Sequence, residues 1–254
     1  MIFLLVRILP FFLPLLLFIF GASLFYWIRA WPIFLMVILL LNLTFFIFFA
    51  KKFKRPAVWL IFFHSLAVVM VGAFYFLLLS NPWIVRIFLI FWSLLYAVYL
   101  ESIFHYFYQT QKAVLIELKN IIFYTGLMMA FIVGASFINA YIFLNFSGWP
   151  LVLLLGLIFF ILTGNNLIIS GFDFETGLLY ATVVAGLAVE LAVALLFAPV
   201  SFYVSAMILA GFYYLSNVLA VASFKQQLTT RLFAQEIIFV GFILVITLTT
   251  ASWL

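Results

Sequence analysis

Two carboxylic acids lie inside long apolar stretches of this sequence, where an ionisable group is costly and is often functional. Glu190 stands in TVVAGLAVELAVAL, with Gly186 four residues before it and Ala194 four residues after it. Residues four apart share one helix face, so this face combines a carboxyl group with small side chains. We expect the face to point into a helix bundle, with Glu190 protonated unless it has a partner. Glu190 is a candidate proton or cation site; the alternative is a neutral side chain that makes one interhelical hydrogen bond.

The second acid, Glu101, belongs to a polar stripe along one helix face. His64, in the preceding apolar run, is predicted to lie at about the depth of Glu101, which could therefore pair with His64 or with His105 as a charge pair or proton relay. The alternative is an interfacial cluster that reaches water. A haem site between the two histidines is disfavoured because they differ in depth. The stripe follows four-residue intervals: Ser93, Ala97, Glu101, His105 and Gln109.

Uncharged polar residues gather in the cytoplasmic half of the predicted helices. Such side chains could line a wet cavity, although asparagine also serves as a hydrogen-bonding contact between helices. Asp173 and Glu175 lie in a short connection, GFDFET, and either dock a partner, pair within the chain or simply face water. The cavity-lining candidates are Ser93, Asn165, Asn166, Ser216 and Asn217, with Thr163 beside them.

Several chemistries lack the residues that they require. The chain has no cysteine, no lysine within a predicted span, and none of the sequence motifs of zinc proteases, serine hydrolases or nucleotide-binding loops. Its six acidic residues are too scattered for a metal–diphosphate site. We therefore predict no catalytic residue, no cofactor and no metal site, and a protein that is not an enzyme.

The composition indicates which solvent surrounds these residues. The chain is 70% hydrophobic and 7% charged, whereas soluble domains carry about 25% charged residues. The apolar runs are continuous, unlike the alternating strands of a barrel, so the predicted fold is all-α and polytopic. We treat residues 1–254 as one integral membrane domain. Nine runs reach the length of about 20 residues that a spanning helix needs: 6–26, 31–50, 57–79, 84–107, 120–144, 150–171, 176–197, 200–223 and 236–254.

The basic residues predict the orientation. All of the eleven Lys and Arg except Arg29 and Arg86 fall at one set of alternate span ends. Short basic connections stay on the cytoplasmic side. We therefore expect a cytoplasmic N-terminus and an outside C-terminus in the cell membrane, plasma or inner. Trp31, Trp83 and Trp149 then lie at outer span ends, where indole side chains are favoured.

The phrase FIFGAS at 18–23 returns as FIVGAS at 131–136. A shift of roughly 113 to 118 residues also aligns Trp-Pro at 31–32 with Trp-Pro at 149–150, which predicts a parallel duplication of four helices. The copies are 1–119 and 120–235, and 236–254 is a ninth helix. Small residues let helix backbones approach closely in lipid. The predicted helix-packing residues are Gly21, Ala22, Ser23, Gly134, Ala135, Ser136 and Gly186.

Two functional hypotheses follow. The first is a small transporter or permease whose intramembrane carboxyl groups handle a proton or a cationic or amphipathic substrate. The second is a non-catalytic membrane subunit or scaffold that packs against partner proteins or lipids. The expected partners are the lipid bilayer and either other proteins or further copies of the chain, and no nucleic acid is expected.

Overall fold

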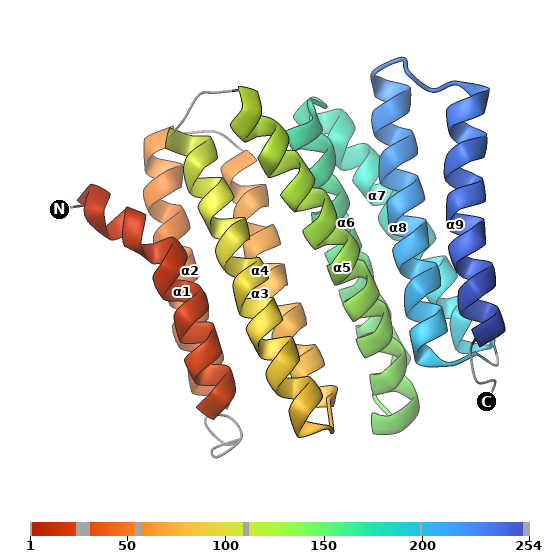
Figure 1. Cartoon of the computed structure of the whole chain (residues 1–254), viewed down its shortest axis with the longest axis horizontal. Coiled ribbons are helices and arrows are strands. Elements are labelled where there is room, and N and C mark those ends of the chain that lie inside the picture. Colours follow the sequence, from red (N-terminus) through yellow and green to blue (C-terminus); the bar gives the residue numbers. More distant parts are fainter. Residues whose placement is uncertain (1, 24–30, 54–56, 109–111, 199, 251–254) are drawn as a thin grey trace. The chain divides into compact units, whose positions relative to one another are not determined.

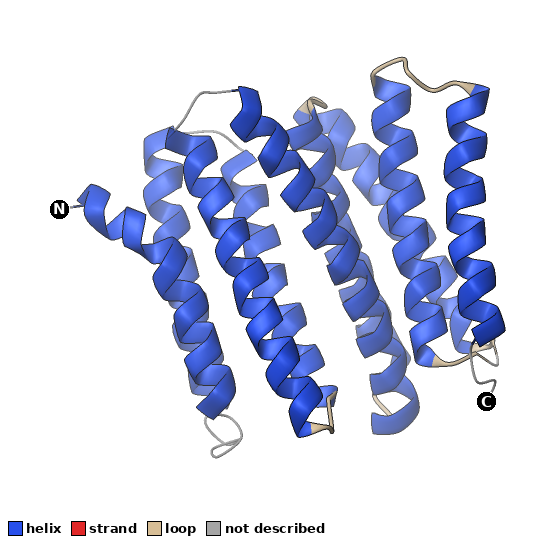
Figure 2. Ribbon diagram, in the orientation of Figure 1, coloured by secondary structure: helices blue, strands red, loops and turns tan. Residues whose placement is uncertain are grey.

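The computed structural model describes residues 2–23, 31–53, 57–108, 112–198 and 200–250. Within these ranges the chain is helical throughout, apart from short connections, and contains no strand (Figure 2). The nine helices are labelled in Figure 1. They are α1 (Ile2–Ser23), α2 (Trp31–Phe53), α3 (Ala57–Leu78), α4 (Pro82–Tyr108), α5 (Lys112–Leu144), α6 (Gly148–Ser170), α7 (Phe174–Leu196), α8 (Phe202–Phe224) and α9 (Thr230–Thr250).

The all-α, multi-pass prediction is confirmed. Seven of the helices, α3 to α9, are long and apolar enough to cross a membrane, and the described side chains of α1 and α2 form shorter apolar stretches, Arg7–Ser23 and Leu35–Ile47. Large apolar side chains also cover the outside, with Trp149 77% exposed and Phe197 84% exposed. A surface of this kind requires lipid rather than water as its solvent, so the chain is an integral membrane protein.

Helices α5 and α9 show the largest differences between predicted and observed starts. The chain enters α5 at Lys112 instead of near residue 120, and α9 at Thr230 instead of near residue 236. In the early part of α5, Val114, Leu118 and Ile122 are buried at four-residue intervals, and the charged residues between them are more exposed. This amphipathic pattern extends a helix beyond the apolar run, which a search for hydrophobicity alone does not detect.

The helices fall into two compact units, Met1–Thr125 (unit 1) and Gly126–Leu254 (unit 2). In unit 1, α1 packs on α4 and α2, and α3 packs on α2 and α4. In unit 2, α6 packs on α7 and α8, α7 also packs on α8, and α9 packs on α8. The boundary lies inside α5, a few residues after the predicted start of the second copy.

The two Gly-Ala-Ser phrases lie at close helix contacts. A Cβ atom on Gly21 would collide with Leu89 of α4, and one on Gly134 would lie 3.0 Å from the Cα atom of Ala206 of α8. The predicted shift pairs α1 with α5 and α4 with α8, so the two contacts are equivalent in the proposed repeat. The duplication itself stays a prediction.

A tight connection joins α6 to α7. Gly171 ends α6 with a left-handed backbone (φ 112°), a conformation that glycine adopts without strain. Asp173 then caps α7, because its carboxylate accepts a hydrogen bond of 2.9 Å from the backbone N–H of Thr176. This bond holds the pKa of Asp173 below its ordinary value. The acid that the sequence left without a fixed role is therefore a helix cap.

Candidate functional site

Three buried polar side chains form a closed ring of hydrogen bonds inside unit 1. Asn42 Nδ2 donates to Tyr96 Oη over 2.7 Å, and Ser65 Oγ donates to Asn42 Oδ1 over 3.1 Å. Ser65 Oγ and Tyr96 Oη lie 3.2 Å apart and complete the ring. All three residues are fully buried. The ring joins α2, α3 and α4, so we interpret it as a polar contact that fixes how the three helices pack.

The sequence analysis did not single out any member of this ring. Asn42 gave a readable signal, because it is the only amide in the run ILLLNLTFF, and an amide inside an apolar span usually bonds to another helix. Tyr96 and Ser65 gave none, since tyrosine and serine are common along the whole chain.

His64 is buried beside Tyr99. The two rings lie 5.0 Å apart at 38°, and Tyr99 Oη donates to the carbonyl oxygen of Ile61 over 3.2 Å. Neither ring nitrogen of His64 has a hydrogen-bond partner in the part of the chain that the structure describes. A neutral imidazole offers one donor and one acceptor. His64 is therefore a position where a buried water molecule or a polar group of a ligand could bind.

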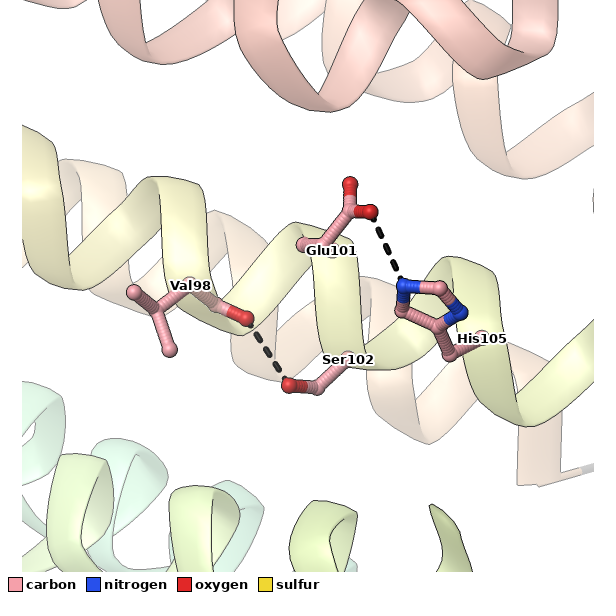
Figure 3. Close-up of polar contacts among 4 residues, drawn as sticks. All are labelled: Val98, Glu101, Ser102 and His105. Atoms are coloured by element: carbon pink, nitrogen blue, oxygen red, sulfur yellow. Dashed lines mark hydrogen bonds and ion pairs between the residues drawn. The ribbon is translucent and has the colours of Figure 1, made fainter. Parts of the chain in front are cut away.

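Glu101 pairs with His105. Glu101 Oε1 lies 2.9 Å from His105 Nε2 (Figure 3), and the two side chains are 34% and 36% exposed. Of the two predicted partners, the structure thus brings His105 to Glu101. In the same view, Ser102 Oγ donates to the backbone carbonyl of Val98 over 2.9 Å.

The other described residues of the stripe present no accessible polar side chain. Ser93 is buried, with no hydrogen-bond partner for its hydroxyl among the described residues, and Ala97 is half-buried. Gln109 lies outside the described residues. Among the described residues of the stripe, the polar side chains that water or a head group can reach are therefore Glu101 and His105.

An apolar cavity, partly open at the surface, lies between helices α1 to α4 of unit 1. Its walls include Leu17 and Gly21 of α1, Ile38 of α2, Gly72 of α3 and Trp92 of α4, and every residue that lines it is apolar. These positions belong to the ends of the helices that the charge pattern assigns to the outer side of the membrane.

Two details explain the apolar character of this cavity. Trp92 Nε1 donates to the carbonyl oxygen of Val68 over 3.1 Å, so the one polar group of the lining residues' side chains is already bonded. A Cβ atom on Gly72 would collide with Trp92, so the glycine allows the indole ring to lie against α3. The sequence analysis did not predict this cavity, because it arises from side chains on four separate helices.

Two members of the predicted polar cluster of unit 2, Asn166 and Asn217, form a contact between helices. Asn166 Nδ2 donates to Asn217 Oδ1 over 2.9 Å, and Asn217 Nδ2 donates to the carbonyl oxygen of Tyr213 over 2.9 Å. Ser216 Oγ donates to the same carbonyl over 3.0 Å. Thr163 and Asn165 precede Asn166 in α6 and are buried, and Thr163 Oγ1 and Asn165 Nδ2 have no hydrogen-bond partner among the described residues. Asn166 and Asn217 join α6 to α8, which favours the packing interpretation over a wet cavity.

The expectation that Glu190 points into the bundle was wrong. Glu190 is exposed, and it lies on the face of α7 opposite to the residues that pack on α6 and α8. Gly186, predicted as a packing residue, is also exposed, and no described atom lies within 4 Å of the position that its Cβ would take. Small residues beside Glu190 allow another helix to approach this face closely, but that helix need not belong to the same chain.

A third acid has a partner that the sequence analysis missed. Tyr214 Oη donates to Glu236 Oε2 over 2.8 Å and joins α8 to α9. Glu236 was placed at the first residue of the predicted ninth span, and a tyrosine partner could not be identified without the arrangement of the helices.

The described residues contain no group of three or more His, Cys, Asp or Glu side chains that could hold a metal ion. Comparison with protein-family models, curated protein sequences and solved structures finds no match to this chain. A functional conclusion therefore rests on the geometry described above.

Proposed function

We propose that the chain is a membrane permease-like protein that binds and moves an amphipathic, lipid-like substrate, with the apolar tail of the substrate in the cavity of unit 1. The observation that carries this proposal is the cavity itself, whose lining is apolar on all four helices. An apolar tail would gain contacts there without displacing any bonded polar group.

The surroundings of the cavity support an amphipathic substrate over a purely apolar one. Ile38 and Trp92 line the cavity, and Asn42 and Tyr96 each lie four residues deeper on the same two helices. Four residues correspond to about 6 Å along a helix, so the ring of Asn42, Ser65 and Tyr96 lies just beyond the inner end of the cavity. On the outer side of the cavity, near the start of α4, Arg86 is exposed, with its guanidinium 5.1 Å from the ring centre of Trp83. A head group would thus stay at the outer surface, near Arg86.

Photolabelling tests the binding step. The purified protein is reconstituted with phosphatidylcholine that carries a diazirine in one acyl chain, irradiated, and digested for mass spectrometry. We expect adducts on the cavity residues Phe76 and Phe88 to exceed those on the exposed Phe242 of α9. Ala73→Leu should lower the cavity adducts because Ala73 lines the cavity, whereas Ala97→Leu, at another half-buried alanine of unit 1, should not.

A second assay tests movement. Vesicles that contain phosphatidylcholine with a fluorescent head group report transfer between leaflets as a change in the fraction that dithionite can quench. We expect faster transfer with the protein than without it, and slower transfer with Ala73→Leu than with Ala97→Leu. Equal labelling of the cavity and α9 would contradict the binding step, and labelling without transfer would contradict the movement.

The second hypothesis, a non-catalytic membrane subunit, is favoured by one separate observation. Glu190 presents a carboxyl group on an exposed face at membrane depth, and a group of this kind needs a partner outside the packed core of unit 2. On this hypothesis the purified chain alone should transfer no lipid, and the chain should co-purify with a stoichiometric partner protein.

A further inference from the structure

The outer face of α7 has a polar group at its centre. On this helix the buried residues Ala181, Ala185, Ala188 and Ala192 form one side with Val184 and Leu195, towards α6 and α8. The exposed residues form the other side, and Glu190 lies in the middle of them. The exposed residues around Glu190 include Leu179, Val183, Gly186, Leu187, Ala194 and Phe197, and we refer to these six together with Glu190 as the α7 outer face.

The depth of Glu190 follows from the bounds of α7, Phe174–Leu196. At 1.5 Å per residue, Glu190 lies about 9 Å from the end of the helix and about 7.5 Å from its middle. The hydrocarbon core of a bilayer is about 30 Å thick, or about 15 Å on each side of the middle. The carboxyl group therefore lies within the hydrocarbon, too deep for a side chain of this length to reach the head groups without distortion.

No bond inside the described part of the chain serves this carboxyl group. Glu190 makes no hydrogen bond or ion pair with the described residues. The two helices that pack on α7 do so on its opposite side: α6 carries no ionisable side chain, and α8 carries only Tyr203, Tyr213 and Tyr214. On α7 itself, the other ionisable side chains are Glu175 and Tyr180, at its cytoplasmic end by the predicted orientation.

We propose that the α7 outer face binds the same face of a second copy of the chain, with the two Glu190 carboxyl groups hydrogen-bonded to each other. Copies of one chain insert with the same orientation, so a two-fold axis along the membrane normal places both Glu190 residues at the same depth. A protonated carboxyl group is at once a donor and an acceptor, and the pair is therefore self-complementary.

Gly186 provides the space that this contact needs. It lies one turn from Glu190 on the same face, and a Cβ atom there would meet no described atom within 4 Å. Two helices can approach closely at such a residue, which shortens the distance that the two carboxyl groups must span. A basic helix of another protein would satisfy one Glu190 as an ion pair, but it would require an additional polypeptide; a second copy requires none.

Cysteine crosslinking tests the contact, since the chain contains no cysteine of its own. Val183→Cys and Ala194→Cys place a thiol on the α7 outer face, and Ile238→Cys places one on exposed α9 as the control. In the membrane in which the chain is expressed, copper phenanthroline should convert the first two variants into covalent dimers much faster than the third. Equal rates at all three positions would indicate random collisions and would overturn the proposal.

Substitutions within the face then test its chemistry. Glu190→Leu should weaken dimerisation by roughly 3- to 30-fold, the effect of one or two interhelical hydrogen bonds, whereas Glu190→Gln should retain it because an amide also donates and accepts.

Gly186→Leu has a matched control in Gly241→Leu on α9, because a Cβ atom at either glycine meets no described atom within 4 Å. Both variants should fold, and only Gly186→Leu should prevent dimerisation. The proposal fails if the two glycine variants dimerise equally well, or if Glu190→Leu dimerises as well as the unmodified chain. Neither result would affect the cavity of unit 1, which the photolabelling tests independently.

Discussion

Removing the hydroxyl group of Tyr96 tests whether the ring of Asn42, Ser65 and Tyr96 stabilises unit 1. Tyr96→Phe deletes the acceptor of the 2.7 Å bond from Asn42 and the 3.2 Å contact with Ser65, at a fully buried position. Ser65 keeps its bond to Asn42 Oδ1, so the principal loss falls on the amide N–H group. Bonds between membrane helices contribute about 0.6–1.7 kcal/mol each, and we expect the free energy of unfolding to fall by about 1–3 kcal/mol.

Reversible unfolding in mixed micelles, followed by the fluorescence of the seven tryptophans, measures this change. Tyr99→Phe is the matched control, because it also removes a buried hydroxyl group from α4 but loses only one bond, to the carbonyl oxygen of Ile61. We expect the control to cost about 0.6 kcal/mol. A double-mutant cycle with Asn42→Leu should show a coupling energy of about 1 kcal/mol with Tyr96→Phe. If the two tyrosine variants are equally stable, or if the coupling energy is zero, the ring does not fix the packing of the helices.

Three further predictions concern stability, the first two measured by the same unfolding in micelles and the third by thermal unfolding. Gly134→Ala should destabilise the protein by about 1–3 kcal/mol, because the added Cβ atom would lie 3.0 Å from a backbone atom of α8, whereas Gly241→Ala should not. Glu101→Gln should change the free energy of unfolding by less than about 0.5 kcal/mol, since its histidine partner is four residues away on the same helix and both side chains are about one-third exposed. Asp173→Ala should lower the midpoint of thermal unfolding by a few degrees at neutral pH. Because the folded-state pKa of Asp173 is lowered, this difference should persist at neutral pH and disappear as the pH falls through the acidic range.

The helices themselves could be predicted from the sequence because each is specified by its own residues. A run of about 20 apolar residues has no other way to satisfy its backbone in lipid, and most predicted bounds lie within a few residues of those observed. The exceptions, α5 and α9, begin in amphipathic or polar segments, whose helical state depends on packing at one face.

The polar contacts could be predicted only in part, because they depend on pairs of helices. The pairing of Glu101 with His105 was accessible, since both lie on α4 four residues apart. The bonds of Asn42 with Tyr96 and of Tyr214 with Glu236 each join two helices. The sequence shows that such residues are present, but it does not show which faces meet.

Glu190 shows most clearly how the face of a helix is chosen. Alanines at 181, 185, 188 and 192 form a second small-residue stripe on α7, and this stripe, rather than the one that contains Gly186 and Glu190, packs inside unit 2. From the sequence alone the two stripes are equivalent as packing surfaces. We expected the carboxyl group to lie on the stripe that packs, because burying it within the protein would remove it from lipid.

Two unpaired polar groups among the described residues, one enclosed and one exposed, have different physical consequences. The ring nitrogens of His64 are enclosed by protein, and one water molecule in the interior could satisfy them without any change outside the chain. The carboxyl group of Glu190 instead lies on the exposed face of α7, where the surrounding hydrocarbon contains neither water nor a hydrogen-bond donor. Its partner must therefore come from another molecule at the same depth, and a second Glu190 meets this condition with no further requirement on the sequence.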